Sequence, residues 1–323
     1  MFQNIIEIVG KPDNLPIAGM LLLIAFFGGW SFCLARRNDR LRQINNKKEE
    51  AEPQRQKDVV DVLDVVYPAE EQGLSRKLHC WPYLTRIEFL AAIFVMALLI
   101  FWSIKIDAPL EEPANPSITP NPAKAPWYFL GLQDMLVYFD PWIAGVVIPG
   151  FIIVGLMAIP YLDTNPKGNG YYTFSERRFP ILTFWFGFLI LWVFEIVIGT
   201  FFRGPGWMWF WPWESWDPHR VVSETNINLN EFFGNITHIQ ALKSENAGLV
   251  IGFLVIASYY LIGSIIPYII LKRRNSQTLL KMGLIRYLLI SFLFWTMMAL
   301  PIKIVLRLLF NIKYVWVTPW FNI

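Results

Sequence analysis

Charged residues are scarce in this chain of 323 residues, and their scarcity excludes an ordinary soluble domain. Asp, Glu, Lys and Arg make up 16% of the chain, whereas in soluble domains they make up about a quarter. Apolar residues make up 55% and aromatic residues 16%. This composition predicts an integral membrane protein, and the net charge of +3 gives no support to a nucleic-acid partner.

Cysteine is nearly absent, and the common nucleotide motifs are missing. The two cysteines are Cys33 and Cys80, and no C-x-x-C-H sequence occurs. We therefore expect no disulfide and no ordinary c-type haem attachment. Because there is no phosphate loop and no G-x-G-x-x-G sequence, nucleotide chemistry has no support. No metal site is predicted.

Six apolar runs predict an all-α integral membrane protein with about six transmembrane helices. The runs cover residues 15–35, 89–104, 142–162, 179–202, 247–271 and 287–302. A spanning helix needs about 20 residues, so the second and last runs are long enough only with their flanks.

Basic residues predict how these helices are oriented. A cluster of Arg36, Arg37, Arg40 and Arg42 follows the first run, which predicts an uncleaved anchor with the amino terminus on the outer side. Later inner loops are also basic, whereas the outer loop 105–140 has only two basic residues. Three further cations would lie near the outer face, and their spacing predicts an amphipathic tail along the surface: Lys303, Arg307 and Lys313.

The stretch NPAKAPWYFLGLQDMLVYFDPW, residues 121–142, joins two of the runs. Pro126 suits the first position of a helix. A helix starting there places Trp127, Leu130, Gly131 and Asp134 on one face. That face predicts an apolar wall with one acid, suited to a flat, hydrophobic ligand that carries protons.

Here the sequence resembles the carboxy-terminal half of cytochrome b. The run ITPNPAKAPWYFL, residues 118–130, is similar to the outer-side loop whose P-E-W-Y motif lines the quinol-oxidation site of bc1 and b6f complexes. VVIPG, IPYLDTNP and ERRFPI resemble the following helix and inner loop of that half, called subunit IV in b6f complexes. The resemblance covers roughly residues 86–202, or three consecutive spans.

The apolar runs, the composition between them and the resemblance together predict a division of the chain into five parts. They are an amino-terminal anchor (1–37), a cytoplasmic linker (38–85), a three-helix subunit IV-like domain (86–202), an outer-side Trp-rich loop (203–246), and two extra spans with the amphipathic tail (247–323).

The resemblance also implies a function, namely a quinone-site subunit of a membrane quinol oxidoreductase. The quinol, derived from menaquinone or ubiquinone, would contact Pro126, Trp127, Tyr128, Phe129 and Leu130. Implied partners are a cytochrome b6-like chain, a Rieske iron–sulfur protein, c-type cytochrome subunits and lipids. The implied location is an energy-transducing membrane, such as the inner membrane of a bacterium.

One departure from the family pattern concerns the proton acceptor. Pro126 stands where the motif has its glutamate, and Ala125 stands where the motif has its proline. Since quinol oxidation needs a nearby base, the catalytic candidates are Asp134 and Glu195. Alternatively, Asp134 is solvated or pairs with Lys124, and Glu195 is buried against a donor from another subunit.

Histidines bear on haem binding. The three are His79, His219 and His238, and all lie outside the predicted spans. A b-type haem between spans needs histidines within them, so b haems and iron–sulfur clusters are expected only on partner chains. An extra haem near His79 and Cys80 is a weaker alternative to a structural role.

Two features have competing interpretations. The tryptophans between Trp207 and Trp216 indicate an interfacial belt more strongly than a quinone platform. For the whole chain, the rival interpretation is a haem-free membrane scaffold that has lost quinol chemistry. A transporter is disfavoured, because no inverted repeat is apparent.

Overall fold

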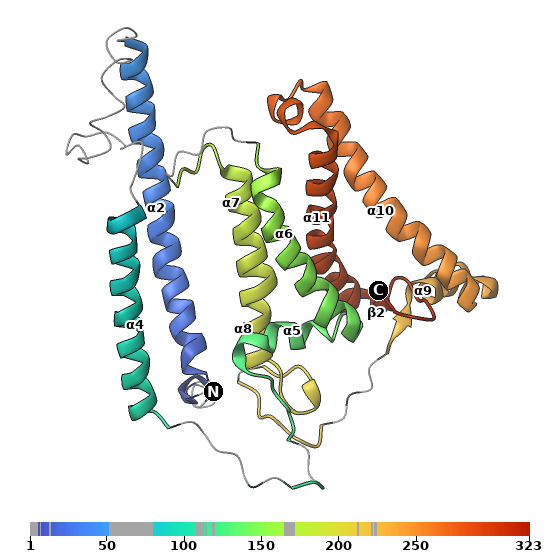
Figure 1. The fold of residues 1–323 in the computed structure, drawn as a ribbon. Coiled ribbons are helices and arrows are strands. Elements are labelled where there is room, and N and C mark those ends of the chain that lie inside the picture. Colours follow the sequence, from blue (N-terminus) through green and yellow to red (C-terminus); the bar gives the residue numbers. More distant parts are fainter. Residues whose placement is uncertain are drawn as a thin grey trace. The chain divides into compact units, whose positions relative to one another are not determined.

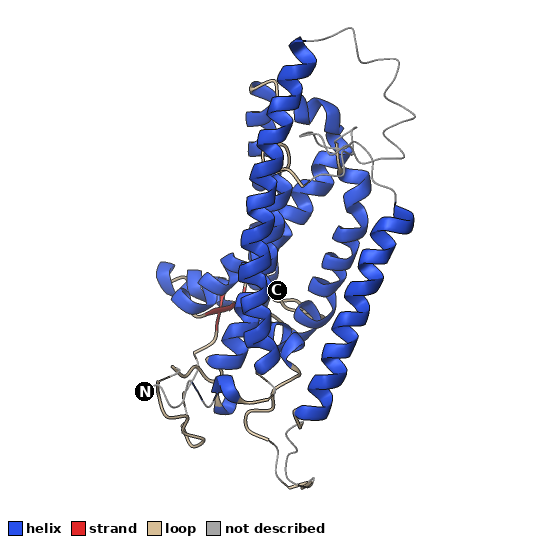
Figure 2. Cartoon of the chain, turned by 90° about the vertical axis from the view of Figure 1, so that its left-hand side faces the viewer, coloured by secondary structure: helices blue, strands red, loops and turns tan. Residues whose placement is uncertain are grey.

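Helices account for nearly all regular structure (Figure 2). The computed structural model describes residues 6, 8–12, 14–51, 80–107, 113, 115–117, 120–164, 172–211, 213–220, 222 and 225–323. Within these residues, six helices are long and apolar enough to cross a membrane: Leu15–Ile44, Cys80–Lys105, Ile143–Leu162, Arg178–Phe201, Glu245–Arg273 and Gln277–Phe310. The protein is an all-α integral membrane protein, and the six predicted spans are confirmed.

Figure 1 labels the main elements along the chain. The α-helices are α2 (Leu15–Ala51), α4 (Thr85–Lys105), α5 (Leu130–Met135), α6 (Ile148–Leu162), α7 (Arg178–Trp185), α8 (Phe194–Phe201), α9 (Leu229–Thr237), α10 (Glu245–Arg273) and α11 (Gln277–Phe310). The π-helical stretches are η1 (Cys80–Leu84), η3 (Ile143–Val147) and η4 (Phe186–Val193). The short 3-10 turns are η2 (Trp127–Phe129), η5 (Pro205–Trp207) and η6 (Gln240–Lys243). Two short strands, β1 (Ile227–Asn228) and β2 (Ile312–Tyr314), pair in parallel.

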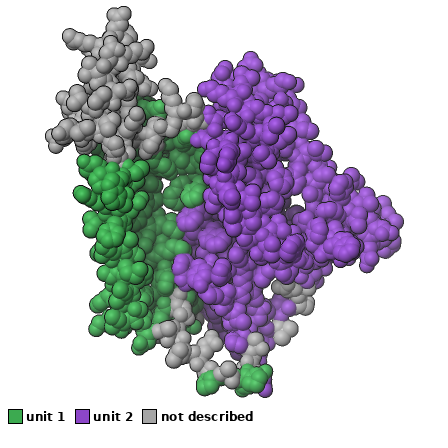
Figure 3. All heavy atoms as spheres, viewed as in Figure 1, with its two compact units in different colours: residues 1–116, 167–185 green, residues 117–166, 186–323 purple. Residues whose placement is uncertain are grey.

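The chain divides into two compact units, coloured separately in Figure 3. The first contains residues Met1–Pro116 and Lys167–Trp185, and the second contains Ser117–Pro166 and Phe186–Ile323. The stretch 121–142 therefore belongs entirely to the second unit.

In the first unit, polar contacts join α2 to the segment before α7. Asp39 accepts hydrogen bonds from the backbone N–H and the hydroxyl of Ser175, the latter at 2.8 Å. Arg42 pairs with Glu176, and the Asn38 amide donates to the Tyr172 carbonyl oxygen at 3.1 Å. The part of α2 that follows the predicted anchor, at the start of the predicted linker, thus contacts the segment before α7 directly.

Several predicted boundaries differ from the structure. The anchor boundary at residue 37 falls inside α2, which continues to Ala51 because no Gly or Pro interrupts its polar half. The predicted outer loop 203–246 contains α9, which starts with a capping box formed by Asn228 and Glu231.

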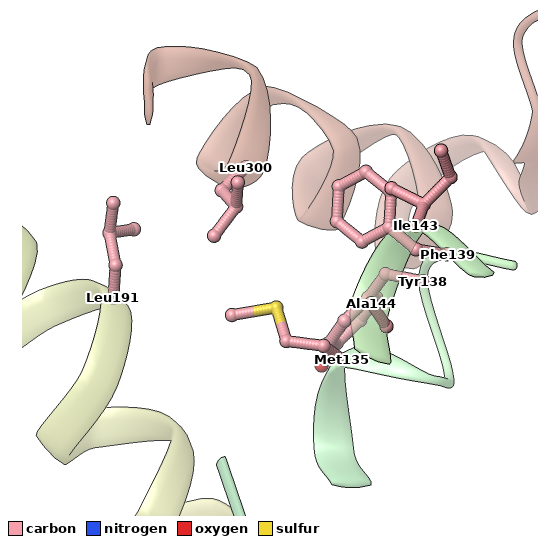
Figure 4. Packing of buried hydrophobic residues seen from close by; sticks show 7 residues of the cluster. All are labelled: Met135, Tyr138, Phe139, Ile143, Ala144, Leu191 and Leu300. Carbon is pink, nitrogen blue, oxygen red and sulfur yellow. The ribbon is translucent and has the colours of Figure 1, made fainter. Parts of the chain in front are cut away.

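A hydrophobic cluster in the second unit supports α5 and the turn that follows it. Its buried members are Met135, Tyr138, Phe139, Ile143, Ala144, Leu191 and Leu300. They come from α5, the following turn, η3, η4 and α11, as the close-up in Figure 4 shows. The cluster therefore holds the short helix α5 against residues of three membrane-spanning helices.

Helices α10 and α11 form a hairpin that is joined by hydrogen bonds. The Trp295 indole N–H donates to the Gly263 carbonyl oxygen at 2.6 Å, and the Tyr259 hydroxyl donates to the Trp295 carbonyl oxygen at 2.7 Å. The Tyr287 hydroxyl donates to the Ser264 carbonyl oxygen at 2.7 Å. Small residues and interhelical hydrogen bonds are common where membrane helices pack.

Replacing Gly263 with alanine is expected to destabilise this hairpin. A Cβ at Gly263 would lie 2.6 Å from the Trp295 ring, which cannot move away without losing its hydrogen bond. Overpacking of this kind costs about 1–3 kcal/mol of unfolding free energy. Thermal unfolding of the purified protein in detergent measures the loss. In the control Gly150→Ala, no atom lies within 4 Å of the new Cβ, so equal destabilisation would contradict the prediction.

The predicted amphipathic tail is different in the structure. Helix α11 continues through Lys303 and Arg307 to Phe310, and the side chains of both basic residues are buried. Lys303 lies over the rings of Phe139 and Tyr314, at 5.7 and 5.8 Å from their centroids. The expected surface position fails because the chain after α11 folds back as β2 and covers this end of the helix.

Candidate functional site

The helix predicted to start at Pro126 begins as the 3-10 turn η2 at Trp127 and becomes the α-helix α5 only at Leu130. Pro126 caps the turn η2, and its carbonyl oxygen accepts a hydrogen bond from the Phe129 N–H at 2.8 Å. The Gln133 side chain closes the preceding loop, since it accepts from the Ala125 N–H and donates to the Ala123 carbonyl oxygen, both at 2.8 Å. These bonds fix the loop onto α5.

Helix α5 packs closely against α8. A Cβ on Gly131 would lie 3.3 Å from the Trp192 carbonyl oxygen and 3.6 Å from Glu195 Cβ. A Cβ on Gly199 would lie 3.1 Å from the Leu130 carbonyl oxygen. Because neither glycine has a side chain, the two backbones approach and bring the acid of α5 next to the acid of α8.

The structure confirms that Leu130, Gly131 and Asp134 share one face, and that face is buried. It packs on α8 and so does not form an open wall. Leu130, a predicted quinone contact, is 3% exposed, so within this chain its side chain serves for packing. Trp127 lies in η2, one turn earlier, and is only partly buried.

Asp134 forms an ion pair with Arg203. The Arg203 Nε donates to Asp134 Oδ1 at 2.7 Å, and both side chains are buried. The other guanidinium nitrogens contact the Trp207 carbonyl oxygen at 3.3 Å and the Tyr138 hydroxyl at 3.4 Å. The predicted alternatives for Asp134, solvation or pairing with Lys124, are therefore wrong. Lys124 donates to the Thr200 carbonyl oxygen at 2.9 Å instead.

Glu195 completes this buried group. It lies in α8 directly after the π-helical stretch η4, a type of irregularity that is frequent at functional sites. Its side chain is 2% exposed, and its carboxyl group lies within hydrogen-bonding range of the Asp134 carboxyl. The interaction partner of Glu195 is thus in its own chain, whereas the sequence left open a donor from another subunit.

Tyr138 borders the two acids. Burial, followed by the nearby Asp134 carboxylate, raises the pKa of the Tyr138 phenol well above its ordinary value. Tyr138 therefore stays protonated and is available as a hydrogen-bond donor. We use "acid cluster" below for Asp134, Tyr138, Glu195 and Arg203.

The predicted aromatic contacts are more accessible than the acids. Tyr128 is 48% exposed and Phe129 is 50% exposed. Their ring centroids lie 4.7 Å apart, and the Trp127 ring packs edge-on against Tyr128 at 5.7 Å. Pro126 is also exposed. This row of rings is an apolar surface that precedes Asp134 of the acid cluster by five to seven residues.

Sequence reasoning missed Arg203 and Tyr138. Arg203 directly follows a predicted span, where it was counted as part of the outer loop. A cation at the end of a span that contains an acid was an available signal, because buried ionisable groups near membranes usually pair. Tyr138 gave no signal beyond its place in an aromatic stretch.

The cysteine and histidine predictions concern other parts of the chain. Cys33 and Cys80 are exposed in the structure, and His79 lies outside the described residues. His219 follows the Trp-rich segment and His238 ends α9, so neither is in a candidate span. Among the residues that the structure describes, no three His, Cys, Asp or Glu side chains group together as metal ligands.

The Trp-rich segment has exposed aromatic rings. Trp211 and Trp213 stack with their centroids 5.0 Å apart, and both are exposed. Trp209 packs edge-on against Trp211 and also lies under the Arg203 guanidinium. Exposed rings directly after a span fit the interfacial belt that the sequence predicts.

Comparison with known families decides what this site belongs to. Residues 113–202 match the family described as cytochrome b(C-terminal)/b6/petD. This segment is a carboxy-terminal cytochrome b-like region. The cytochrome b-like region contains Asp134, Tyr138 and Glu195, and Arg203 is the first residue after it.

A second comparison, with individual known proteins, agrees with this family match. Cytochrome b of Acanthamoeba castellanii is 25% identical over 166 residues, which cover 50% of this chain and 39% of the relative. The alignment therefore spans well under half of that relative. No solved structure matches the chain significantly. The family match starts at residue 113, after α4, so it covers less than the predicted domain 86–202.

Proposed function

We propose that this chain is a quinone-site subunit of a bc1/b6f-type quinol oxidoreductase, and that it forms one wall of the outer-side quinol-oxidation pocket. The observation that carries the proposal is the acid cluster. Within a cytochrome b-like region, the buried Asp134 follows the aromatic row by five to seven residues and lies next to the buried Glu195. A quinol substrate needs an apolar surface for its ring and a base for its protons.

The aromatic row provides the apolar surface. Tyr128 and Phe129 expose about half of each side chain, and Trp127 supports Tyr128 edge-on. Flat rings pack well against such surfaces. Pro126 sets the start of the turn that presents them. Leu130 supports the wall from behind by packing on α8.

The acid cluster provides a base in place of the motif glutamate, which this sequence lacks. Pro126 cannot accept a proton, whereas Asp134 and Glu195 can. Both acids are buried within this chain, so a proton reaches them through water or a hydrogen-bonded side chain, without direct contact by the quinol. In the proposed reaction, the electrons pass to cofactors of partner chains.

The proposal extends to the assembly. The b haems belong to a cytochrome b6-like chain, the first electron goes to a Rieske iron–sulfur protein, and c-type cytochrome subunits receive it. The assembly lies in a bacterial inner membrane, with the amino terminus of this chain on the outer side. The five-part division of the chain, with its boundaries adjusted to the helices, is part of this proposal.

Quinol-dependent reduction of the haems in the purified assembly tests the function. Glu195→Gln and Asp134→Asn are each expected to slow the reaction about 100-fold, the lower end of what a positioned acid or base contributes. Glu245→Gln, at the exposed start of α10, is the matched control and should react at the wild-type rate. Wild-type rates in both acid variants would exclude the acids as acceptors.

A second candidate function is a haem-free scaffold that has lost quinol chemistry. The observation in its favour is Pro126 at the position of the motif glutamate. The same measurement separates the two, because a scaffold predicts that no quinol is oxidised at this pocket. Tyr128→Ala and Phe129→Ala sharpen the comparison, since a raised KM in either variant supports a quinol bound at the aromatic row.

A further inference from the structure

The acid cluster contains more negative charge than its single guanidinium balances. Asp134 is 0% exposed, Glu195 is 2% exposed and Arg203 is 6% exposed, so water screens none of them. Arg203 remains charged under all ordinary conditions. Its charge balances one carboxylate, and the 2.7 Å bond from Nε to Oδ1 identifies that carboxylate as Asp134.

Among the residues that the structure describes, no second cation pairs with Glu195. The charged and titratable groups that act on it are Asp134 from α5 and Arg203, which follows α8, and Tyr138 borders the same group. An ionised Glu195 would give the cluster a net charge of −1. Burying such a charge without a partner is costly.

Hydrogen bonding leads to the same result. Two ionised carboxylates cannot bond to each other, because both only accept. In that state Asp134 Oδ2 and Glu195 Oε2 have no partner among the described residues. The two carboxyl groups nevertheless lie within hydrogen-bonding range. One proton between them would supply the missing donor and would remove the excess charge.

We propose that Asp134 and Glu195 share one proton, and that Arg203 is the positioning residue that keeps Asp134 as the ionised member. Glu195 then carries the exchangeable proton. A proton entering from the pocket binds one carboxyl while the shared proton leaves from the other, so the step moves protons and no electrons. The shared proton does not depend on the proposed function, whereas its use in proton exit rests on that function.

Infrared spectroscopy of the purified assembly, without quinol, tests this proposal. The wild type should show a protonated carboxyl C=O band that shifts in D2O. Glu195→Gln should abolish the band, and the control Glu245→Gln should keep it. Absence of the band in the wild type, or its survival in Glu195→Gln, would overturn the proposal.

The role of Arg203 is tested by the intensity of the same carboxyl band. In Arg203→Gln, Asp134 loses its counter-charge and should also be protonated, so the carboxyl band should grow about twofold. Arg203→Lys retains the charge and should restore the wild-type intensity. An unchanged band in Arg203→Gln would remove Arg203 from the proposal. Because these spectra need no quinol, a failure of the proposed function leaves them interpretable.

Discussion

Replacing Arg203 with leucine is expected to destabilise the protein more than any other single change at the site. The guanidinium donates to Asp134, Tyr138 and the Trp207 carbonyl oxygen from a buried position. Its removal leaves Asp134 buried with no counter-charge, so Asp134 must take up a proton or stay ionised without a partner. Breaking a buried pair in this way costs about 3–5 kcal/mol. Thermal or denaturant unfolding of the purified assembly in detergent measures this loss.

A double variant separates this effect from lost packing. Arg203→Leu combined with Asp134→Leu removes both charges, so the uncompensated carboxylate disappears. The double variant should therefore be more stable than Arg203→Leu alone. If the two losses simply add, the ion pair contributes nothing specific, and the destabilisation of Arg203→Leu comes from packing.

The spans were predictable because each is fixed by local composition. A run such as 247–271 is long and apolar, and helix is the state that satisfies its backbone hydrogen bonds in lipid. The ends were less predictable. Helix α2 continues to Ala51 through charged residues that also favour helix, so the change from apolar to polar does not mark its end.

The site was predictable in its chemistry but not in its pairing. The helical period placed Leu130, Gly131 and Asp134 on one face correctly. The choice of Arg203 over Lys124 as partner depends on how closely α5 approaches α8, and no local pattern indicates that distance. Gly131 and Gly199 permit this approach, and their meaning became clear only once the two helices were seen together.

For the carboxy-terminal cations, the predicted location was wrong. Spacing predicted that Lys303 lies on the membrane surface, whereas the structure buries it to 3% exposure between aromatic rings. Spacing alone does not show whether later chain returns to cover a helix face. Here β2 pairs with β1, which brings Tyr314 over α11.

Replacing Lys303 with methionine is expected to stabilise the protein, in contrast to Arg203→Leu. Lys303 Nζ has no hydrogen-bond partner among the described residues, and its nearest favourable contacts are the rings of Phe139 and Tyr314. A ring face offsets about 2 kcal/mol of the cost of burying a cation, which is less than the several kcal/mol that the burial costs. Methionine fills a similar volume without a charge, so the unfolding free energy should rise by about 1–4 kcal/mol.

The matched control for Lys303→Met is Lys281→Met, because Lys281 lies in the first part of α11, before the kink at Gly283, and is exposed. Its unfolding free energy should change by less than about 0.5 kcal/mol. The comparison is made by thermal unfolding of the purified assembly, in which any partner of Lys303 on another chain is also present. If Lys303→Met destabilises the assembly instead, the ammonium has an acceptor there, and its burial is compensated in the way that Arg203 is compensated by Asp134. The signs of the two substitutions thus separate a buried cation that pairs with a described residue of this chain from one for which the described residues offer no acceptor.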